Sequence, residues 1–215
     1  MQKAWLPQLD PPLQQQLLAL GRERTLLVGE VLFHRGDSFD GIYLLQQGLL
    51  LISGVNRHGD EALLTVIEPG VVFGEIALFD GEARTHDAIA AQPCRLLHFP
   101  ALALQQLLKQ HPQWWQHLGQ LLTAKMRQAF LALEQQTLLS ARARLCWRLW
   151  QLCPENGARL PLSQQQLAQL LGLSRQSTNQ LLRALEREGV IALSYGALVL
   201  LRRDYLQREL EHAGV

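Results

Sequence analysis

The sequence predicts an α+β fold: an N-terminal antiparallel β-roll, a long helix and a C-terminal winged helix-turn-helix. Three features predict it. Short apolar or alternating segments separated by glycines fill residues 25–99, a helical stretch follows Pro112, and residues 162–200 combine two short capped helices with a hairpin. We therefore expect a roll with flanking helices over residues 1–111, a long helix and hinge over 112–139, and a winged helix over 140–215.

The N-terminal part begins with a helix and continues as strands. Residues 12–20 have helical spacing and stop at Gly21, a usual helix terminator. The apolar segments that follow are LLVGEVLF, IYLLQQGLLLISG, ALLTVI, VVFGEIAL, AIAA and CRLLHF. Glycines separate them at intervals typical of hairpins, which favours an antiparallel roll or barrel. Residues 101–109 are helical again.

The stretch from Pro112 to about residue 139 contains one glycine and no further proline. A helix of about 26 residues would be about 39 Å long, more than a compact roll needs. Its apolar positions recur every three or four residues, and we assign them to dimerisation: Leu118, Leu122, Met126, Ala129 and Leu133. The alternative is that this stripe packs on its own roll, because Lys125 and Gln136 interrupt it.

The C-terminal part carries clear helix signals. A helix over 140–153 is followed by a loop at 154–157. Ser163 then caps a helix over 164–171, with Gln166 completing a capping box, and Gly172 supplies a turn. Ser174 caps a second helix over 175–187, and a hairpin turning near Tyr195 and Gly196 forms the wing.

The second of these helices has a polar exposed face without a carboxylate before Glu186. A helix that enters the major groove needs hydrogen-bonding side chains near its N-terminus and no carboxylate facing the phosphates. The predicted DNA-binding residues are Ser163, Ser174, Arg175, Gln176, Asn179, Gln180 and Arg183. The alternative is a polar, solvated helical hairpin.

Charge distribution favours the same interpretation. The formal net charge is only +1, but residues 1–137 carry −3 and residues 138–215 carry +4. A basic C-terminal part indicates a polyanionic partner there.

Composition limits the class of protein. Hydrophobic residues make up 48% and charged residues 18%, as in ordinary globular chains. There is no apolar stretch of about 18 residues and no signal-peptide pattern, so we expect a cytoplasmic protein without a membrane partner. Cys94, Cys146 and Cys153 lack a C-x-x-C pair, and we expect buried thiols and no metal site.

One segment of the roll, FGEIALFDGEARTHDAIAA over residues 73–91, carries charged and hydroxyl groups among apolar residues. Gly74 and Glu75 precede the pair Arg84 and Thr85 by ten residues. A guanidinium beside a hydroxyl suits phosphate oxygens, and Glu75 would accept from a ribose hydroxyl. The alternative is an internal Glu75–Arg84 ion pair without any ligand.

The order of these parts, with FGEIAL…RT in the roll and LGLSRQSTNQLLRALEREGVI in the winged helix, resembles the CRP/FNR family of bacterial regulators from about Leu26 to Leu201. The resemblance implies that an effector binds the roll, that long helices pair two subunits, and that winged helices bind a palindromic operator. Gly74 and Glu75 then resemble the phosphate-pocket glycine and ribose-binding glutamate, and Arg84 and Thr85 the cyclic-phosphate ligands.

The resemblance also implies partners. It places base-reading roles on Arg175, Gln176 and Gln180. The implied partners are double-stranded DNA, a second copy of the chain and RNA polymerase. The candidate effectors are cyclic AMP, cyclic GMP and cyclic di-GMP.

Some residues depart from the family pattern. His86 stands where nucleotide-binding relatives have a small residue, and Leu133 and Glu134 fall about where cyclic-AMP-responsive members have Thr-Ser. Both weigh against cyclic AMP. Gln176 and Gln180 replace a Glu and an Arg of the best-known member, which predicts a different operator.

Four alternatives stay open. The first is an effector-independent regulator with a vestigial pocket. The second is a redox- or haem-responsive regulator, for which the roll offers four histidines: His34, His58, His86 and His98. A metalloenzyme on a cupin-like roll would need an H-x-H pair, which is absent. A nucleotide-binding signalling module would need no winged helix. No catalytic motif indicates an enzyme.

Overall fold

The computed structural model describes residues 9, 11–58, 61–194 and 196–214. The chain divides into two compact units, which separate between Gln128 and Ala129 in the middle of one long helix. The predicted limits at 111/112 and 139/140 lie near the two ends of this helix. Each unit is described by itself below.

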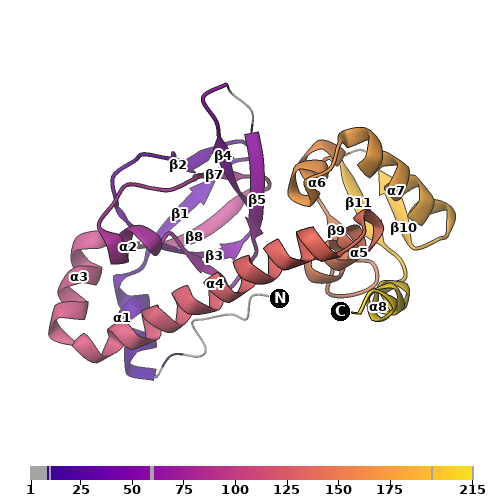
Figure 1. Ribbon diagram of the computed structural model, residues 1–215. Coiled ribbons are helices and arrows are strands. Elements are labelled where there is room, and N and C mark those ends of the chain that lie inside the picture. The colour runs from indigo at the N-terminus through magenta and orange to yellow at the C-terminus, as the bar shows by residue number, and fades with distance from the viewer. Residues whose placement is uncertain (1–8, 10, 59–60, 195, 215) are drawn as a thin grey trace. The chain divides into compact units, whose positions relative to one another are not determined.

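The N-terminal unit is an antiparallel roll with helices (Figure 1). Its elements are α1 (Pro11–Leu20), β1 (Arg22–Leu26), β2 (Val31–Phe33), β3 (Gly41–Gln47), β4 (Leu50–Val55), β5 (Glu61–Ile67), β6 (Val72–Phe73), α2 (Ile76–Asp80), β7 (Asp87–Ala90), β8 (Cys94–Pro100), α3 (Ala101–Gln110), the 3-10 turn η2 (Pro112–Trp114) and the start of α4 (Trp115–Leu138). Two four-stranded sheets have the orders β1-β8-β3-β6 and β2-β7-β4-β5. The predicted α+β class and antiparallel roll are confirmed.

Strand β3 separates two hydrophobic cores because its side chains alternate across the sheet. Tyr43 and Leu45 point between the two sheets, into a core that includes Leu32 and Leu50 from the opposite sheet. Ile42 and Leu44 belong to the second core, on the other face. Burial on both faces explains why β3 is a nearly continuous apolar run.

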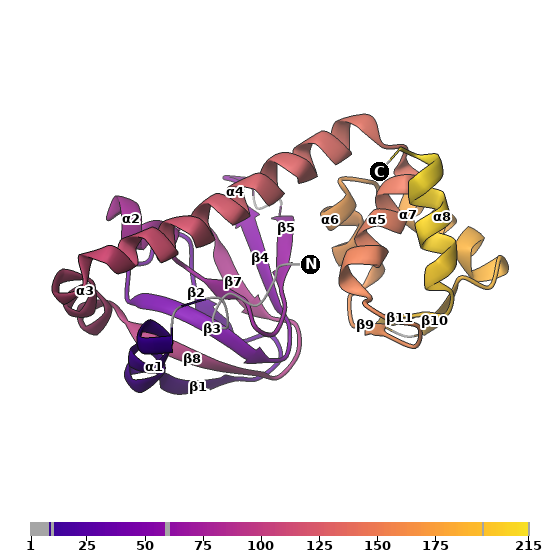
Figure 2. The same ribbon diagram turned by 90° about the horizontal axis from the view of Figure 1, so that it is seen from below.

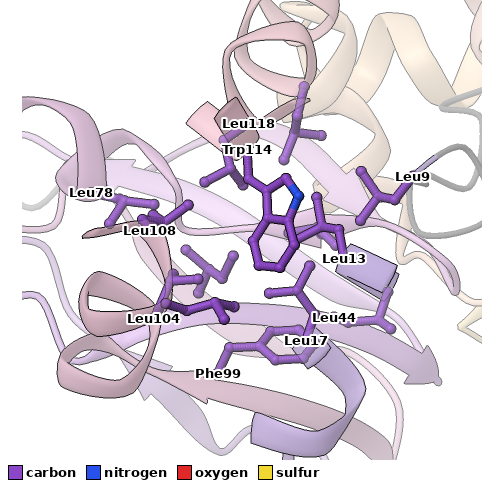
Figure 3. Packing of buried hydrophobic residues seen from close by; sticks show 14 of the residues in the cluster. Leu9, Leu13, Leu17, Leu44, Leu78, Phe99, Leu104, Leu108, Trp114 and Leu118 are labelled. Atoms are coloured by element: carbon purple, nitrogen blue, oxygen red, sulfur yellow. The ribbon is translucent and has the colours of Figure 1, made fainter. Parts of the chain in front are cut away.

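The second core lies between the sheet and the helices. Helix α1 lies beside β1 and β8 (Figure 2) and also contacts α3. Trp114 of η2 sits among Leu13 and Leu17 of α1 and Leu104 and Leu108 of α3 (Figure 3). The side chains of α1 and α3 therefore close the outer face of the sheet.

Two predicted strand segments differ from the structure. The run LLVGEVLF is broken by a turn, in which Leu27 and Val28 are exposed. The run VVFGEIAL is strand β6 followed by helix α2, because Gly74 adopts φ 86° and redirects the chain. A run of apolar residues does not distinguish a buried strand from a short helix.

The C-terminal unit contains the end of α4 and a winged helix. Its other elements are α5 (Ala141–Leu152), β9 (Arg159–Leu160), α6 (Gln164–Leu171), α7 (Arg175–Arg187), β10 (Ile191–Ser194), β11 (Ala197–Leu200) and α8 (Arg203–His212). The expected helices of this unit and the hairpin β10–β11 are confirmed, while Tyr195 of the expected turn lies outside the described residues. Strand β9, which pairs with β11, and helix α8 were not predicted.

Helix α8 is held by a polar cluster. Arg142 of α5 donates to Glu188 at the end of α7 (2.6 Å) and to Tyr205 (2.5 Å) and Glu209 (3.1 Å) of α8. Burial lowers the pKa of Arg142, but these charge-assisted bonds outweigh burial and raise this pKa above its ordinary value. The cluster links α5, the C-terminal end of α7 and α8.

Among the helices of the described residues, none combines the length and apolar character that a bilayer crossing requires.

Candidate functional sites

The segment that carries the candidate effector residues changes direction at Gly74. Gly74 ends β6 with φ 86°, and a Cβ there would lie 2.7 Å from the Nη1 atom of Arg84. A side chain at this position would therefore strain the backbone and displace Arg84. Glycine is required because the Arg84 guanidinium packs directly against the backbone of residue 74.

Arg84 is buried, with 4% of its surface exposed. Its Nη1 donates to the Gly74 carbonyl at 2.7 Å, and its Nη2 donates to Asp40 Oδ1 and to the Gly41 carbonyl at 2.5 Å each. The guanidinium carbon lies 4.4 Å from the ring centre of Phe33. Its Nε is buried without a partner in the described part of the chain. The charge of Arg84 is thus balanced within the protein.

Asp40 is the residue that balances it. Its other carboxylate oxygen accepts a hydrogen bond from the Tyr43 hydroxyl, and His98 Nε2 lies 3.7 Å from the same oxygen. Burial raises the pKa of Asp40, but the hydrogen bonds from Tyr43 and Arg84 outweigh it and hold this pKa below its usual value. Burial and the bond to Asp40 raise the pKa of Tyr43. The carboxylate therefore stays ionised beside Arg84.

Glu75 is buried as well, with 2% of its surface exposed, but it does not pair with Arg84. Its carboxylate accepts from Lys125 of α4 at 2.8 Å. The internal Glu75–Arg84 pair, left open from the sequence, is absent from the ion pairs of the described residues. Both groups are paired, each with a different residue.

Sequence reasoning missed Asp40 and Lys125. Lys125 did give a signal, because it interrupts an otherwise apolar stripe. Leu133 and Glu134, which fall about where cyclic-AMP-responsive members have Thr-Ser, are exposed and belong to the C-terminal unit. From α4, Lys125 contacts the site through its bond to Glu75.

Thr85 and His86 lie at the exposed side of this site. Thr85 is exposed, and its hydroxyl lies 2.9 Å from His86 Nδ1. His86 is half-buried, and burial, followed by the charge of Arg35, lowers its pKa. Its ring approaches Gly54 of β4. Thr85 is therefore exposed, unlike the buried Glu75 and Arg84.

Other histidines of the roll have protein partners. His34 Nδ1 lies 3.2 Å from Asp87, and His98 Nε2 lies 3.0 Å from the Asp40 carbonyl and stacks on Tyr43. Within the described residues, no three or more His, Cys, Asp or Glu side chains form a group suited to a metal ion.

The two helices of the candidate DNA-binding site are capped as predicted. Ser163 Oγ accepts from the Gln166 amide at 3.2 Å, while Gln166 Oε1 accepts from the Ser163 amide at 2.8 Å. Ser174 Oγ accepts from the Ser177 amide at 3.0 Å. The two caps fix where α6 and α7 begin.

The turn between α6 and α7 depends on Gly172, which has φ 63°. A Cβ there would lie 2.5 Å from Nε2 of Gln136, in the last turns of α4. The C-terminal end of α4 therefore contacts the turn between α6 and α7. This contact explains why residues 129–138 of α4 belong to the same compact unit as the winged helix.

Of the predicted DNA-binding residues, Ser163 caps α6 and Ser174 caps α7, while Arg175, Gln176, Asn179, Gln180 and Arg183 lie along one face of α7. Its opposite face buries Thr178, Leu182 and Leu185. The side chains of Arg175, Gln176 and Gln180 are exposed and have no partner among the described residues. Ser174 and Arg183 are also exposed, while Ser163 and Asn179 are half-buried.

Arg183 connects this face to the wing. It donates to Glu186 at 2.8 Å, and Glu186 also accepts from the Leu193 amide of β10 at 3.2 Å. These two bonds lower the pKa of Glu186. Glu186, the first carboxylate of α7, is therefore paired with Arg183 and also accepts a hydrogen bond from the backbone of the wing.

The apolar stripe of α4 is largely exposed. Phe130 is 64% exposed and Leu133 60%, and Met126 and Ala129 are exposed too, while Leu122 is half-buried. Leu118 differs, because it is 2% exposed and packs in the core below α3. The stripe available to a partner therefore begins after Leu118.

Comparison with protein families finds two matching domains. The model of the cyclic nucleotide-binding domain matches residues 23–111, and that of the Crp-like helix-turn-helix domain matches residues 143–209. Together they cover the roll and the winged helix.

Individual relatives match over most of their length. The chain is 30% identical over 182 residues to the cyclic AMP receptor protein of Thermus thermophilus, covering 84% of each chain. It is 27% identical over 201 residues to the global nitrogen regulator of Synechocystis, covering 86% of this chain and 89% of the relative. A CRP/FNR family transcriptional regulator from Thermus thermophilus has a similar structure, with TM-score 0.73 and 26% identity over 88% of this chain and 98% of that one. The chain therefore belongs to the CRP/FNR family of transcription regulators.

Proposed function

We propose that this regulator binds a palindromic DNA site as a homodimer and that a small effector in the roll controls its affinity for DNA. The observation that carries the DNA-binding assignment is the exposed face of α7, where Arg175, Gln176 and Gln180 have no partner in the described structure. Free donors and acceptors on a capped helix suit base edges in the major groove. Ser163, Ser174, Asn179 and Arg183 complete the proposed interface.

The dimer is supported by α4. Exposed Met126, Ala129, Phe130 and Leu133 recur at helical spacing, and a second copy of the helix would remove them from water. In such a dimer the two recognition helices would lie about 34 Å apart, one turn of DNA. Contact with RNA polymerase would follow if the protein activates transcription.

Sedimentation tests the dimer. We expect a dimer at micromolar concentration, and a monomer after Phe130→Glu or Leu133→Glu. The matched control is Leu102→Glu, because Leu102 is 77% exposed and lies on α3 and not on α4. A monomeric parent chain that still binds a palindrome with full affinity would contradict the proposal.

The effector is proposed from the site and from relatives. Gly74, Glu75, Arg84 and Thr85 lie along one segment of the roll, and the relatives include a cyclic AMP receptor protein. We therefore propose a cyclic nucleotide, with cyclic AMP, cyclic GMP and cyclic di-GMP as candidates. Such a ligand would engage the exposed Thr85 hydroxyl first and would compete with Asp40 and Lys125 for Arg84 and Glu75.

That competition supports a second candidate, an effector-independent regulator with a vestigial pocket. Both charged groups of the site already have ionic partners, so the roll is electrostatically complete without a ligand. Calorimetric titration with the three nucleotides, followed by DNA binding with and without each, distinguishes the candidates. Binding that changes the DNA affinity supports control by an effector. Absence of binding, together with specific DNA binding by the free protein, supports the second candidate.

A further inference from the structure

One residue of the proposed DNA interface is held from another helix. Asn179 Nδ2 on α7 donates a hydrogen bond of 2.7 Å to Oε1 of Gln164, the first residue of α6 and 15 positions earlier. Its neighbours on the exposed face, Arg175, Gln176 and Gln180, have no partner among the described residues. Asn179 is therefore oriented before any DNA arrives.

Gln164 is available for this bond because it has no part in capping its own helix. Ser163 and Gln166 form the capping box at the start of α6. The side chain of Gln164 crosses instead to α7, and both amides are half-buried. The bond adds a polar link between the two helices at the edge of their exposed face.

We propose that Gln164 is a positioning residue that fixes the amide of Asn179 toward DNA, so that Asn179 sets the preference for one base pair in each half-site. This inference rests on the proposed function. It adds Gln164 to the DNA interface as a residue that acts through Asn179.

The chemistry of the fixed amide indicates the base. The bond uses one N–H of Asn179 and leaves Oδ1 and the second N–H free. Adenine presents an N6 donor and an N7 acceptor in the major groove, which these two groups match. Because the amide is already ordered, its rotamer entropy is not lost again on binding. The preferred base opposite Asn179 is adenine.

Selection from random double-stranded DNA with the full-length chain tests the inference, with each of the three cyclic nucleotides and without them. The variants are Gln164→Ala, Asn179→Ala and the double variant. Both single variants should reduce the preference for adenine at the same base position by about tenfold. The double variant should resemble Asn179→Ala, because Gln164 acts through Asn179. Gln165→Ala, an exposed neighbour on α6, should keep the parent preference.

A second pair of variants distinguishes the effect of the Asn179–Gln164 hydrogen bond from a general effect on folding. Gln164→Glu retains the acceptor oxygen and should keep the base preference, although its charge weakens binding to all DNA. Gln165→Glu adds the same charge without the bond and measures that general weakening. Loss of the preference in Gln164→Glu would mean that Asn179 does not donate to residue 164, and it would overturn the inference.

The remaining outcomes are also decisive. If the parent chain selects a palindrome and Gln164→Ala lowers binding equally for every base, Gln164 acts on phosphate or stability, and this inference alone fails. If the parent selects no sequence under any condition, the proposed function fails and the inference with it.

Discussion

In the roll, Arg84 and Glu75 are almost completely buried and each has an ionic partner, whereas on α7 Arg175, Gln176 and Gln180 are exposed and unpaired among the described residues. The roll site is complete as a piece of protein structure, so a ligand must compete for its charged groups. On α7, Arg175, Gln176 and Gln180 would lose only water on binding DNA, because they have no protein partner among the described residues. Substitutions in the roll should therefore reduce stability, while substitutions on α7 should reduce DNA binding and leave stability unchanged.

The largest effect is expected for Arg84→Ala. The change leaves the Asp40 carboxylate and the carbonyls of Gly74 and Gly41 without their donor, which should cost about 3 kcal/mol in the free energy of unfolding. Arg183→Ala removes another arginine with a carboxylate partner, but an exposed one, and should cost at most about 0.5 kcal/mol. Urea unfolding monitored by circular dichroism measures both. If the two variants lose equal unfolding free energy, the buried arginine of the roll does not stabilise the protein more than the exposed arginine of α7, and the proposed contrast between the two regions is wrong.

A somewhat smaller effect is expected for Lys125→Met, which leaves the buried Glu75 carboxylate without its partner. We expect a loss of about 2 kcal/mol, smaller than for Arg84 because Lys125 is itself partly exposed. Adding Glu75→Gln to Lys125→Met should recover most of the loss, since no buried charge then remains. If the double variant is less stable than Lys125→Met, the ion pair is not what stabilises this contact.

On α7 the expected effect is on binding. Arg175→Ala should weaken binding to the selected DNA by about 1–3 kcal/mol and leave the unfolding free energy unchanged, because Arg175 is exposed and unpaired in the described structure. Fluorescence anisotropy with the selected site and with a scrambled duplex measures it. An equal loss on both duplexes would assign Arg175 to phosphate contact.

The same contrast explains what the sequence could predict. The ends of α6 and α7 follow from neighbouring residues, since Ser163, Gln166 and Ser174 bond within their own turns. Arg84 and Glu75 stood out as charges in an apolar segment, but their partners lie 44 and 50 positions away. Such pairing depends on how the chain folds back, which local spacing does not encode.

Burial of Leu118 was missed for a related reason. A helical stripe shows which residues share a face but not what covers each turn of it. The first turns of α4 face the core beneath α3, so Leu118 is buried there, while Phe130 and Leu133 further along the helix are exposed. Helix α2 was likewise hidden in an apolar run, because its start depends on the conformation of Gly74.

The smallest effect is a pH dependence centred on Asp40, whose side chain is 46% exposed. Burial opposes ionisation of Asp40, but hydrogen bonds from Tyr43 and Arg84 outweigh it and lower the folded-state pKa from the ordinary value of 3.8. A lowered folded pKa means that the stabilisation is fully present above pH 3.8 and is lost as the pH falls through the folded pKa. Asp40→Asn should therefore be less stable than the parent chain at neutral pH, and the difference should shrink in acid. Urea unfolding at neutral pH and at about pH 3 measures it, with Asp204→Asn as the control for a more exposed ion pair. A difference that stays constant over this range would show that Asp40 stabilises the roll by hydrogen-bond geometry alone, and that the charge of Arg84 is not balanced by that carboxylate.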